Sequence, residues 1–125
     1  MNHIFVDTSA LIAIGNKRDA FHSQACAIND ELSRSNVTFI TTSAILLEFG
    51  NAFSSIHFKP FAIKLIDAIT RSKKWKSIVV DQNLMSRSFA LFSQMSDKEW
   101  GLVDCSSMVV AQDMGIRDAV SYTHL

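Results

Sequence analysis

Four carboxylates stand at positions from which they could do chemistry. Asp7 directly follows the apolar run 4–6, Glu48 lies in a helical pattern after a second β-prone run, and Asp97 and Asp104 lie near the start of a late helical pattern. Carboxylates that converge repel one another and raise one another's pKa, and a hard divalent cation relieves that repulsion. Mg²⁺ prefers oxygen ligands, whereas the scattered His and Cys residues do not suit zinc. The joint placement of the acids therefore favours a magnesium site.

Each acid also has a purely structural interpretation. Asp is among the preferred N-cap residues, so Asp7 would cap a helix that begins at Thr8. Glu48 would be an ordinary solvated helix acid, and Asp104 would be favoured by the dipole at a helix start. Asp97 lies in a polar segment that is typical of a solvated loop. Taken one at a time, these interpretations suffice.

Apolar periodicity predicts the elements that must position the acids. Strands are expected at 4–6, 37–42, 78–80 and 119–122, and helices at about 21–32, 43–56, 60–69, 82–95 and 102–114, the last capped by Gly115. Strands that alternate with helices indicate a parallel sheet covered on both faces. In such sheets ligands gather at the carboxyl ends of the strands. The acids that follow strands are therefore the residues to inspect.

Four of these helices have predicted apolar faces, the first of them formed by Phe21, Ala25, Ile28 and Leu32. The expected core residues are Ile45, Phe49, Ala52, Phe53 and Ile56 in the second helix, and Phe61, Leu65, Ile66 and Ile69 in the third. The helix at 82–95 has a broad apolar surface that includes Met85, Phe89 and Phe92. Most of the Phe residues at 49, 53, 58 and 61 are expected in the core, and a partner would cover any surplus.

Composition limits the class of protein. The chain has 125 residues, 48% of them hydrophobic, and its 12 basic residues balance its 12 acidic ones. This predicts one packed domain and argues against disorder and against a strongly basic nucleic-acid binder. No apolar stretch approaches the length of a membrane span and no secretory signal precedes the domain, so a cytoplasmic protein without membrane association is expected.

One dense basic cluster remains, formed by Arg71, Lys73, Lys74 and Lys76 around Trp75. Its cations could contact RNA phosphates, and Trp75 could stack on an unpaired base. Alternatively, the cluster is a solvated helix end, where cations suit the dipole. The residues alone do not decide between the two.

Three segments carry a resemblance to a known family: 5–10, 42–48 and 97–105, the last reading Asp-Lys-Glu-Trp-Gly-Leu-Val-Asp-Cys. They are similar to PIN-domain proteins, and above all to the VapC-type ribonuclease toxins of prokaryotic toxin–antitoxin pairs. The resemblance implies a single PIN-like domain over 1–125, a three-layer α/β/α sandwich with a central parallel sheet, and cleavage of RNA that depends on Mg²⁺ or Mn²⁺. It assigns metal-binding and catalytic roles to Asp7, Glu48 and Asp104, with Thr8, Ser9 and Asp97 in support. It also implies a cognate antitoxin and a homodimer.

The chain departs from the family pattern near its end. Thr123 stands where the family places a further acid, and the sequence stops at Leu125, before the family's last edge strand. The number of metal ions is therefore left open, and an edge strand is expected to be missing. The main alternative is a non-catalytic PIN-like module that binds RNA or protein. A phosphohydrolase that forms an aspartyl phosphate ranks last, because Ser9 stands where that chemistry needs a second acid.

Overall fold

A four-stranded parallel sheet forms the centre of the molecule. The computed structural model describes residues 2–16, 22, 23, 26, 27, 30, 34–116 and 118–120. The strands are β1 (Asn2–Val6), β2 (Val37–Thr42), β3 (Trp75–Ile78) and β4 (Asp118–Val120), in the order β3-β2-β1-β4. Every strand pair is parallel, with Ile4 beside Phe39 and Phe39 beside Trp75. The predicted parallel sheet is confirmed.

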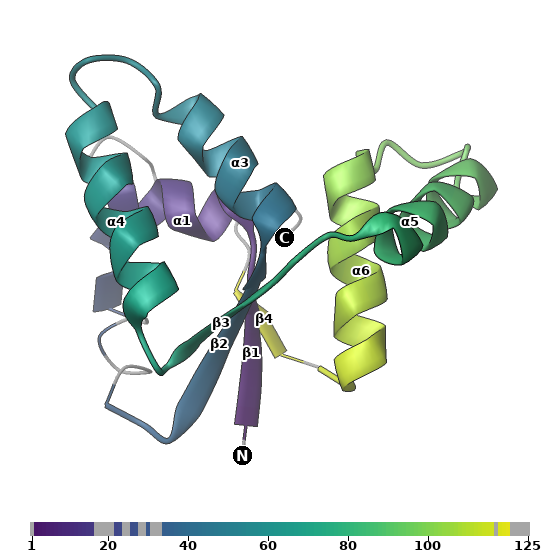
Figure 1. Cartoon of the computed structure of the whole chain (residues 1–125), viewed down its shortest axis with the longest axis horizontal. Coiled ribbons are helices and arrows are strands. Elements are labelled where there is room, and N and C mark those ends of the chain that lie inside the picture. The colour runs from purple at the N-terminus through teal and green to yellow at the C-terminus, as the bar shows by residue number, and fades with distance from the viewer. Residues whose placement is uncertain are drawn as a thin grey trace.

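Helices cover both faces of this sheet. They are α1 (Thr8–Gly15), α3 (Ser43–Ala52), α4 (Lys59–Arg71), α5 (Gln82–Gln94) and α6 (Leu102–Met114). Figure 1 shows α1, α3 and α4 on one side of the sheet, and α5 and α6 on the other. The predicted three-layer α/β/α arrangement is therefore confirmed. Of the helix predicted at 21–32, only residues 22, 23, 26, 27 and 30 are described.

The central strands explain the continuous apolar runs of the sequence. β1 is paired at both edges, with β2 and β4, and helices cover both of its faces, so Phe5 and Val6 are buried. A strand buried on both faces needs apolar side chains at consecutive positions. In β2, Ile40 and Thr41 are likewise fully buried. The core continues into the helices on both faces of the sheet.

The third strand lies earlier in the chain than predicted. The sequence predicts it at 78–80, whereas β3 pairs with β2 from Trp75 to Ile78 and ends where β2 ends. Beyond it, Val79 is 71% exposed, and the Val80 amide donates to Ser43 Oγ, 2.9 Å away, at the start of α3. Only Ile78 of the apolar run 78–80 thus belongs to the strand, and Val79 and Val80 belong to the connection to α5. The ring of Trp75 stacks on Phe39 with centroids 4.9 Å apart.

The helix after β2 is shorter than predicted. α3 ends at Ala52, which is exposed, and Ile56 lies in the following turn, 88% exposed. The assignment of Ala52 and Ile56 to the core was therefore wrong. Phe53 remains buried after the helix ends because its ring contacts the rings of Phe49, Phe58 and Phe61.

The other predicted faces agree with the structure more closely. Ile45, Phe49 and Ile69 are buried, and Phe61, Leu65 and Ile66 are half-buried against the core. α5 and α6 occur at the predicted ranges, and Gly115 ends α6 with a φ of 64°, a left-handed conformation that favours glycine. β4 (118–120) begins one residue before the last predicted strand, at 119–122, and residues 121–125 lie outside the described residues.

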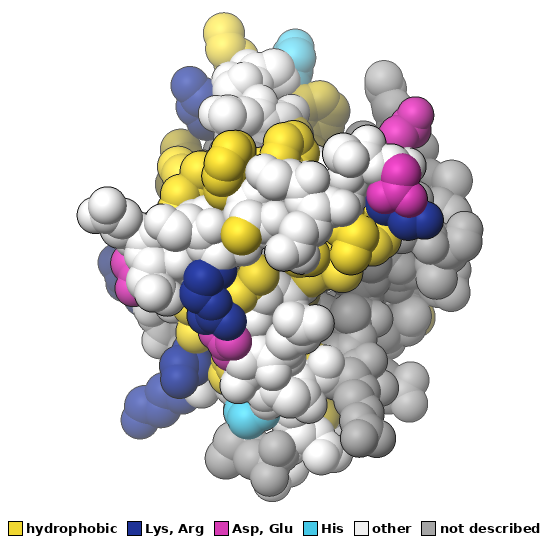
Figure 2. Space-filling view, turned by 90° about the vertical axis from the view of Figure 1, so that its right-hand side faces the viewer, with side chains coloured by type: hydrophobic (Ala, Val, Ile, Leu, Met, Phe, Trp, Pro, Cys, Tyr) yellow, Lys and Arg dark blue, Asp and Glu magenta, His cyan; other side chains and the backbone are white. Residues whose placement is uncertain are grey.

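The broad apolar surface of α5 does not lie entirely in the core. Leu84 is buried, but Met85, Phe89 and Phe92 are exposed on the outside of the helix. Figure 2 views the side of the molecule that α5 and α6 form and shows hydrophobic side chains gathered on it. Among the described residues, no helix is long and apolar enough to span a membrane. The cytoplasmic location stays a prediction.

Candidate active site

Asp7 stands where β1 passes into α1. Its Oδ1 accepts a hydrogen bond from the Ala10 amide at 3.1 Å and another from the Ser9 hydroxyl at 2.7 Å. The predicted N-cap is therefore real, and the side chain is half-buried. Both bonds use the same oxygen and leave Oδ2 to other partners. A cap of this kind orients the carboxylate without excluding a second role for it.

Glu48 lies beside the same helix start. The Thr8 hydroxyl, in the first turn of α1, donates a hydrogen bond to Glu48 Oε1 on α3. The Glu48 side chain is exposed to solvent, and its carboxylate points toward Thr8, the residue that follows Asp7. Two acids thus share the amino-terminal end of α1, whose dipole favours negative charge and offsets part of their repulsion.

Asp104 occupies the first turn of α6. Its Oδ2 accepts a hydrogen bond from the Gly101 amide at 3.0 Å, so the predicted role at a helix start is confirmed. α6 contacts α3, and it begins on the side of the molecule toward which β1 runs (Figure 1). Asp104 is half-buried. The three main candidate acids therefore lie at the same end of the fold. Asp7 precedes α1, Glu48 lies on α3, and Asp104 lies in the first turn of α6.

The acids do not form a ready-made metal cage. In the described part of the chain, no group of three or more His, Cys, Asp or Glu side chains could hold a metal ion as it stands. The donor set itself is oxygen only, with hydroxyl and carboxylate groups from Asp7, Thr8, Ser9, Glu48 and Asp104. Such donors fit Mg²⁺, which commonly takes one or two carboxylates and completes its shell with water.

Cys105, next to Asp104, does not contribute a nucleophile. Its side chain is fully buried, and burial, followed by the neighbouring charge of Asp104, raises the pKa of the thiol. A nucleophilic cysteine needs the opposite shift, because the thiolate is the reactive form. Cys105 is thus a small buried residue of the core.

Asp97 differs from these acids in its environment. It occupies the loop between α5 and α6, its side chain is 73% exposed, and Lys98 Nζ is 3.8 Å from its carboxylate. This is the environment of a solvated loop residue. Its supporting role stays a prediction, and Thr123, at the predicted position of a further acid, lies outside the described residues.

The basic cluster lies toward the opposite end of the sheet. Only Arg71 belongs to a helix, α4, where it pairs with Asp67 at 3.0 Å. Lys73 and Lys74 lie in the turn before β3, so the interpretation of the whole cluster as a helix end was wrong. Trp75 begins β3 and stacks on Phe39, which covers one face of its ring. The cluster is at the amino end of a strand, whereas the acids follow the carboxyl ends.

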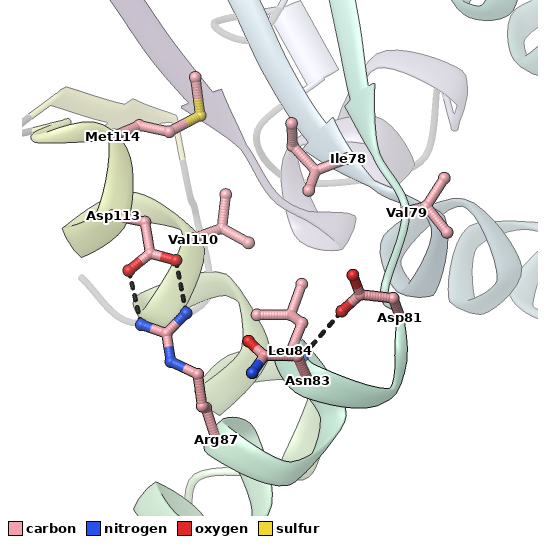
Figure 3. A pocket seen from close by; sticks show the side chains of 9 residues that line it. All are labelled: Ile78, Val79, Asp81, Asn83, Leu84, Arg87, Val110, Asp113 and Met114. Carbon is pink, nitrogen blue, oxygen red and sulfur yellow. Dashed lines mark hydrogen bonds and ion pairs between the residues drawn. The ribbon is translucent and has the colours of Figure 1, made fainter.

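A cavity that the sequence did not predict lies between the end of β3, α5 and α6. Its volume is about 190 Å³, and Figure 3 shows apolar side chains such as Ile78 and Val110 beside polar ones. Arg87 of α5 binds Asp113 of α6 through two hydrogen bonds of 2.7 and 2.6 Å. The hydrogen bond from Arg87 lowers the pKa of Asp113, so this carboxylate stays ionised and joins the two helices.

This cavity is separate from the candidate acids. Asp113 lies nine residues after Asp104 on α6, or about 13 Å along the helix at 1.5 Å per residue. None of Asp7, Glu48 and Asp104 lines the cavity. No sequence signal predicts the Arg87–Asp113 pair, because its members belong to two helices that the loop around Asp97 separates.

The fold was compared with known proteins. No model of a known protein family matches the chain, and no curated protein matches its sequence. Among solved structures, the crystal structure of the Mycobacterium tuberculosis toxin VapC20 is similar, with a TM-score of 0.85 and 25% identity over 97% of this chain and 90% of that one. The chain has the VapC-type PIN-domain fold.

This result confirms the resemblance found in the sequence, and it confirms the PIN-like α/β fold. VapC20 is described as a sarcin–ricin loop cleaving toxin. In the PIN domain described above, Asp7, Glu48 and Asp104 lie toward the carboxyl end of the sheet, where α/β folds bind their ligands, and Asp81 follows β3 at the same end. Their metal-binding and catalytic roles stay predictions.

Proposed function

We propose that this PIN domain is a metal-dependent endoribonuclease that acts as the toxin of a toxin–antitoxin pair. The observation that carries the proposal is the link between Thr8 and Glu48, which brings a second acid to the helix start that Asp7 caps. The likeness to VapC20 over nearly the whole chain supports the same activity. RNA is the proposed substrate.

The proposed cofactor is Mg²⁺ or Mn²⁺. Asp7 and Asp104 would hold the ion, with Glu48 close by. When bound, such an ion lowers the pKa of a coordinated water and stabilises negative charge that develops on a phosphate. The oxygen-only donor set supports this choice of metal.

The protein's own groups prepare the site for this chemistry. Ser9 and the Ala10 amide fix the Asp7 carboxylate, and the Gly101 amide fixes that of Asp104. Uncompensated carboxylates repel a phosphodiester, so we expect RNA to approach the reacting position only when a cation is present. Metal would then be required for productive binding as well as for hydrolysis.

Incubation of the purified chain with a panel of RNAs tests the proposal. We expect new cleavage products with Mg²⁺ or Mn²⁺, and none after excess chelator has removed the metal. Gel electrophoresis and sequencing of the product ends would show where the RNA is cut. Intact RNA under every metal condition would overturn the proposal that the chain is a ribonuclease.

One observation favours the non-catalytic alternative. Thr123 stands where the family places a further acid, and a PIN-like module with one acid fewer would bind RNA or protein without cutting. The same RNA panel distinguishes the two functions. A module of this kind would retain RNA in a filter-binding assay and leave it uncut with either metal.

The basic cluster provides a proposed contact for longer substrates. Lys73, Lys74 and Lys76 are exposed at the far end of the sheet, so a short RNA at the acids would not reach them. Changing all three to Glu should weaken the binding of a long RNA regardless of its sequence. In the unaltered chain the three lysines would contact phosphates and release counterions. Their loss should therefore reduce the steepness of the plot of log affinity against log salt by about 2. An unchanged slope would remove the cluster from the RNA-binding surface.

A cognate antitoxin and a homodimer are proposed as the protein partners. The exposed apolar side chains Met85, Phe89 and Phe92 on α5 support the presence of a partner, since such groups gain stability when they are covered. Sedimentation velocity measures the oligomeric state. A mass of one chain at micromolar concentration would contradict the homodimer.

A further inference from the structure

We propose that Thr8 is a positioning residue that holds the Glu48 carboxylate beside Asp7 before a cation binds. The inference rests on the proposed function in one respect, the identity of the acids as the metal site. It goes beyond that function because it gives Thr8 a task of its own. That task is to fix Glu48, and not to orient Asp7 or a water molecule.

The hydrogen bond itself carries the argument. Thr8 is the first residue of α1, Glu48 lies 40 positions later on α3, and their side chains meet where the two helices pack together. Glu48 is exposed, and an exposed glutamate that has no partner samples many rotamers. The Thr8 hydroxyl selects the rotamers that direct the carboxylate toward the start of α1.

The consecutive hydroxyls of Thr8 and Ser9 donate to different acids. Ser9 donates to Asp7 Oδ1 at 2.7 Å, whereas Thr8 donates to Glu48 Oε1. Because threonine is β-branched, its χ1 angle is restricted, which keeps the donor directed at α3. Each acid therefore has its own hydroxyl, and loss of one hydroxyl should affect one acid.

Metal binding measures this role without any assay of cleavage. Thr8→Val removes the donor at nearly constant shape, and we expect Mn²⁺ to bind about tenfold more weakly in isothermal titration calorimetry, at the lower end of the effect of groups that orient metal ligands. Thr8→Ser keeps the donor and should stay within about twofold of the unaltered chain. Equal affinity of Thr8→Val and the unaltered chain would overturn the proposal.

Thr70→Val is the matched control. The Thr70 hydroxyl donates only to a backbone oxygen of its own helix, that of Asp67 on α4, at 2.9 Å. This variant makes the same chemical change away from the acids and should leave Mn²⁺ affinity unchanged. If Thr8→Val fails to fold, as judged by its circular dichroism spectrum, Thr8→Ala takes its place.

A double-mutant cycle shows whether Thr8 acts through Glu48. In a Glu48→Gln background, Thr8→Val should weaken Mn²⁺ binding by less than twofold, because the group that Thr8 positions is already impaired. A full additional tenfold loss would overturn the proposal, since Thr8 would then act elsewhere.

These measurements also separate the positioning role from the nuclease activity. If Mn²⁺ binding depends on Thr8 but no RNA is cut, the nuclease proposal fails and the role of Thr8 stands. If RNA is cut and Thr8→Val requires no more Mn²⁺ than the unaltered chain for half-maximal rate, the role of Thr8 fails and the nuclease stands. Absence of Mn²⁺ binding by the unaltered chain would overturn both.

Discussion

Replacing Asp7 with Asn should lower the rate of RNA cleavage by about 100-fold or more, because even groups that only orient a metal ligand change activity by about 10- to 100-fold. The substitution removes a negative charge and changes little else. Asn is about as good an N-cap as Asp, so the bond from the Ala10 amide can persist. The thermal midpoint should therefore stay close to that of the unaltered chain, while single-turnover cleavage with Mn²⁺ collapses.

Asp81→Asn is the matched control for this experiment. Asp81 caps α5 as Asp7 caps α1, with its Oδ1 accepting from the Leu84 amide at 2.8 Å, but it lines the separate cavity of Figure 3. We expect its cleavage rate to match that of the unaltered chain. Equal rates for Asp7→Asn and the unaltered chain would refute the catalytic role of Asp7. Equal losses in both variants would assign the effect to helix capping.

Replacing Phe49 with Ala should reduce the free energy of unfolding by about 3–5 kcal/mol, the usual cost of truncating a buried Phe. Phe49 is fully buried on α3, and its ring lies 4.8 Å from that of Phe53. Phe53 in turn contacts Phe58 and Phe61 across to α4. The cavity would therefore loosen the packing of α3, which carries Glu48, against α4. Urea unfolding followed by circular dichroism measures the change.

Phe89→Ala provides the comparison, because the same residue type is 57% exposed on α5. A surface substitution of this kind changes stability by about 0.5 kcal/mol or less. Similar shifts in the urea midpoint for both variants would contradict the description of Phe49 as a core residue. A folded Phe49→Ala variant at low temperature would also show whether Mn²⁺ affinity depends on the rigidity of α3.

Elements with strong local signals were predictable from the sequence. The run at 4–6 became the buried strand β1, and the helix at 102–114 with Gly115 after it became α6 with its left-handed cap. The apolar run 78–80 misled because a run of this length can also be a connection between elements. The bounds of β3 depend instead on its pairing with β2, and the first pair joins Phe39 to Trp75.

For the acids too, local contacts were predictable from the sequence and contacts between helices were not. Sequence by itself determined that Asp7 caps a helix and that Asp104 lies at a helix start, because their bonds join residues three positions apart and depend only on local backbone geometry. Only the tertiary structure decided that Glu48 meets Thr8 and that Arg87 meets Asp113. These contacts join different helices, and their formation depends on how the helices pack on the sheet. Periodicity shows which face of a helix is buried, but it does not show which polar side chain will lie opposite.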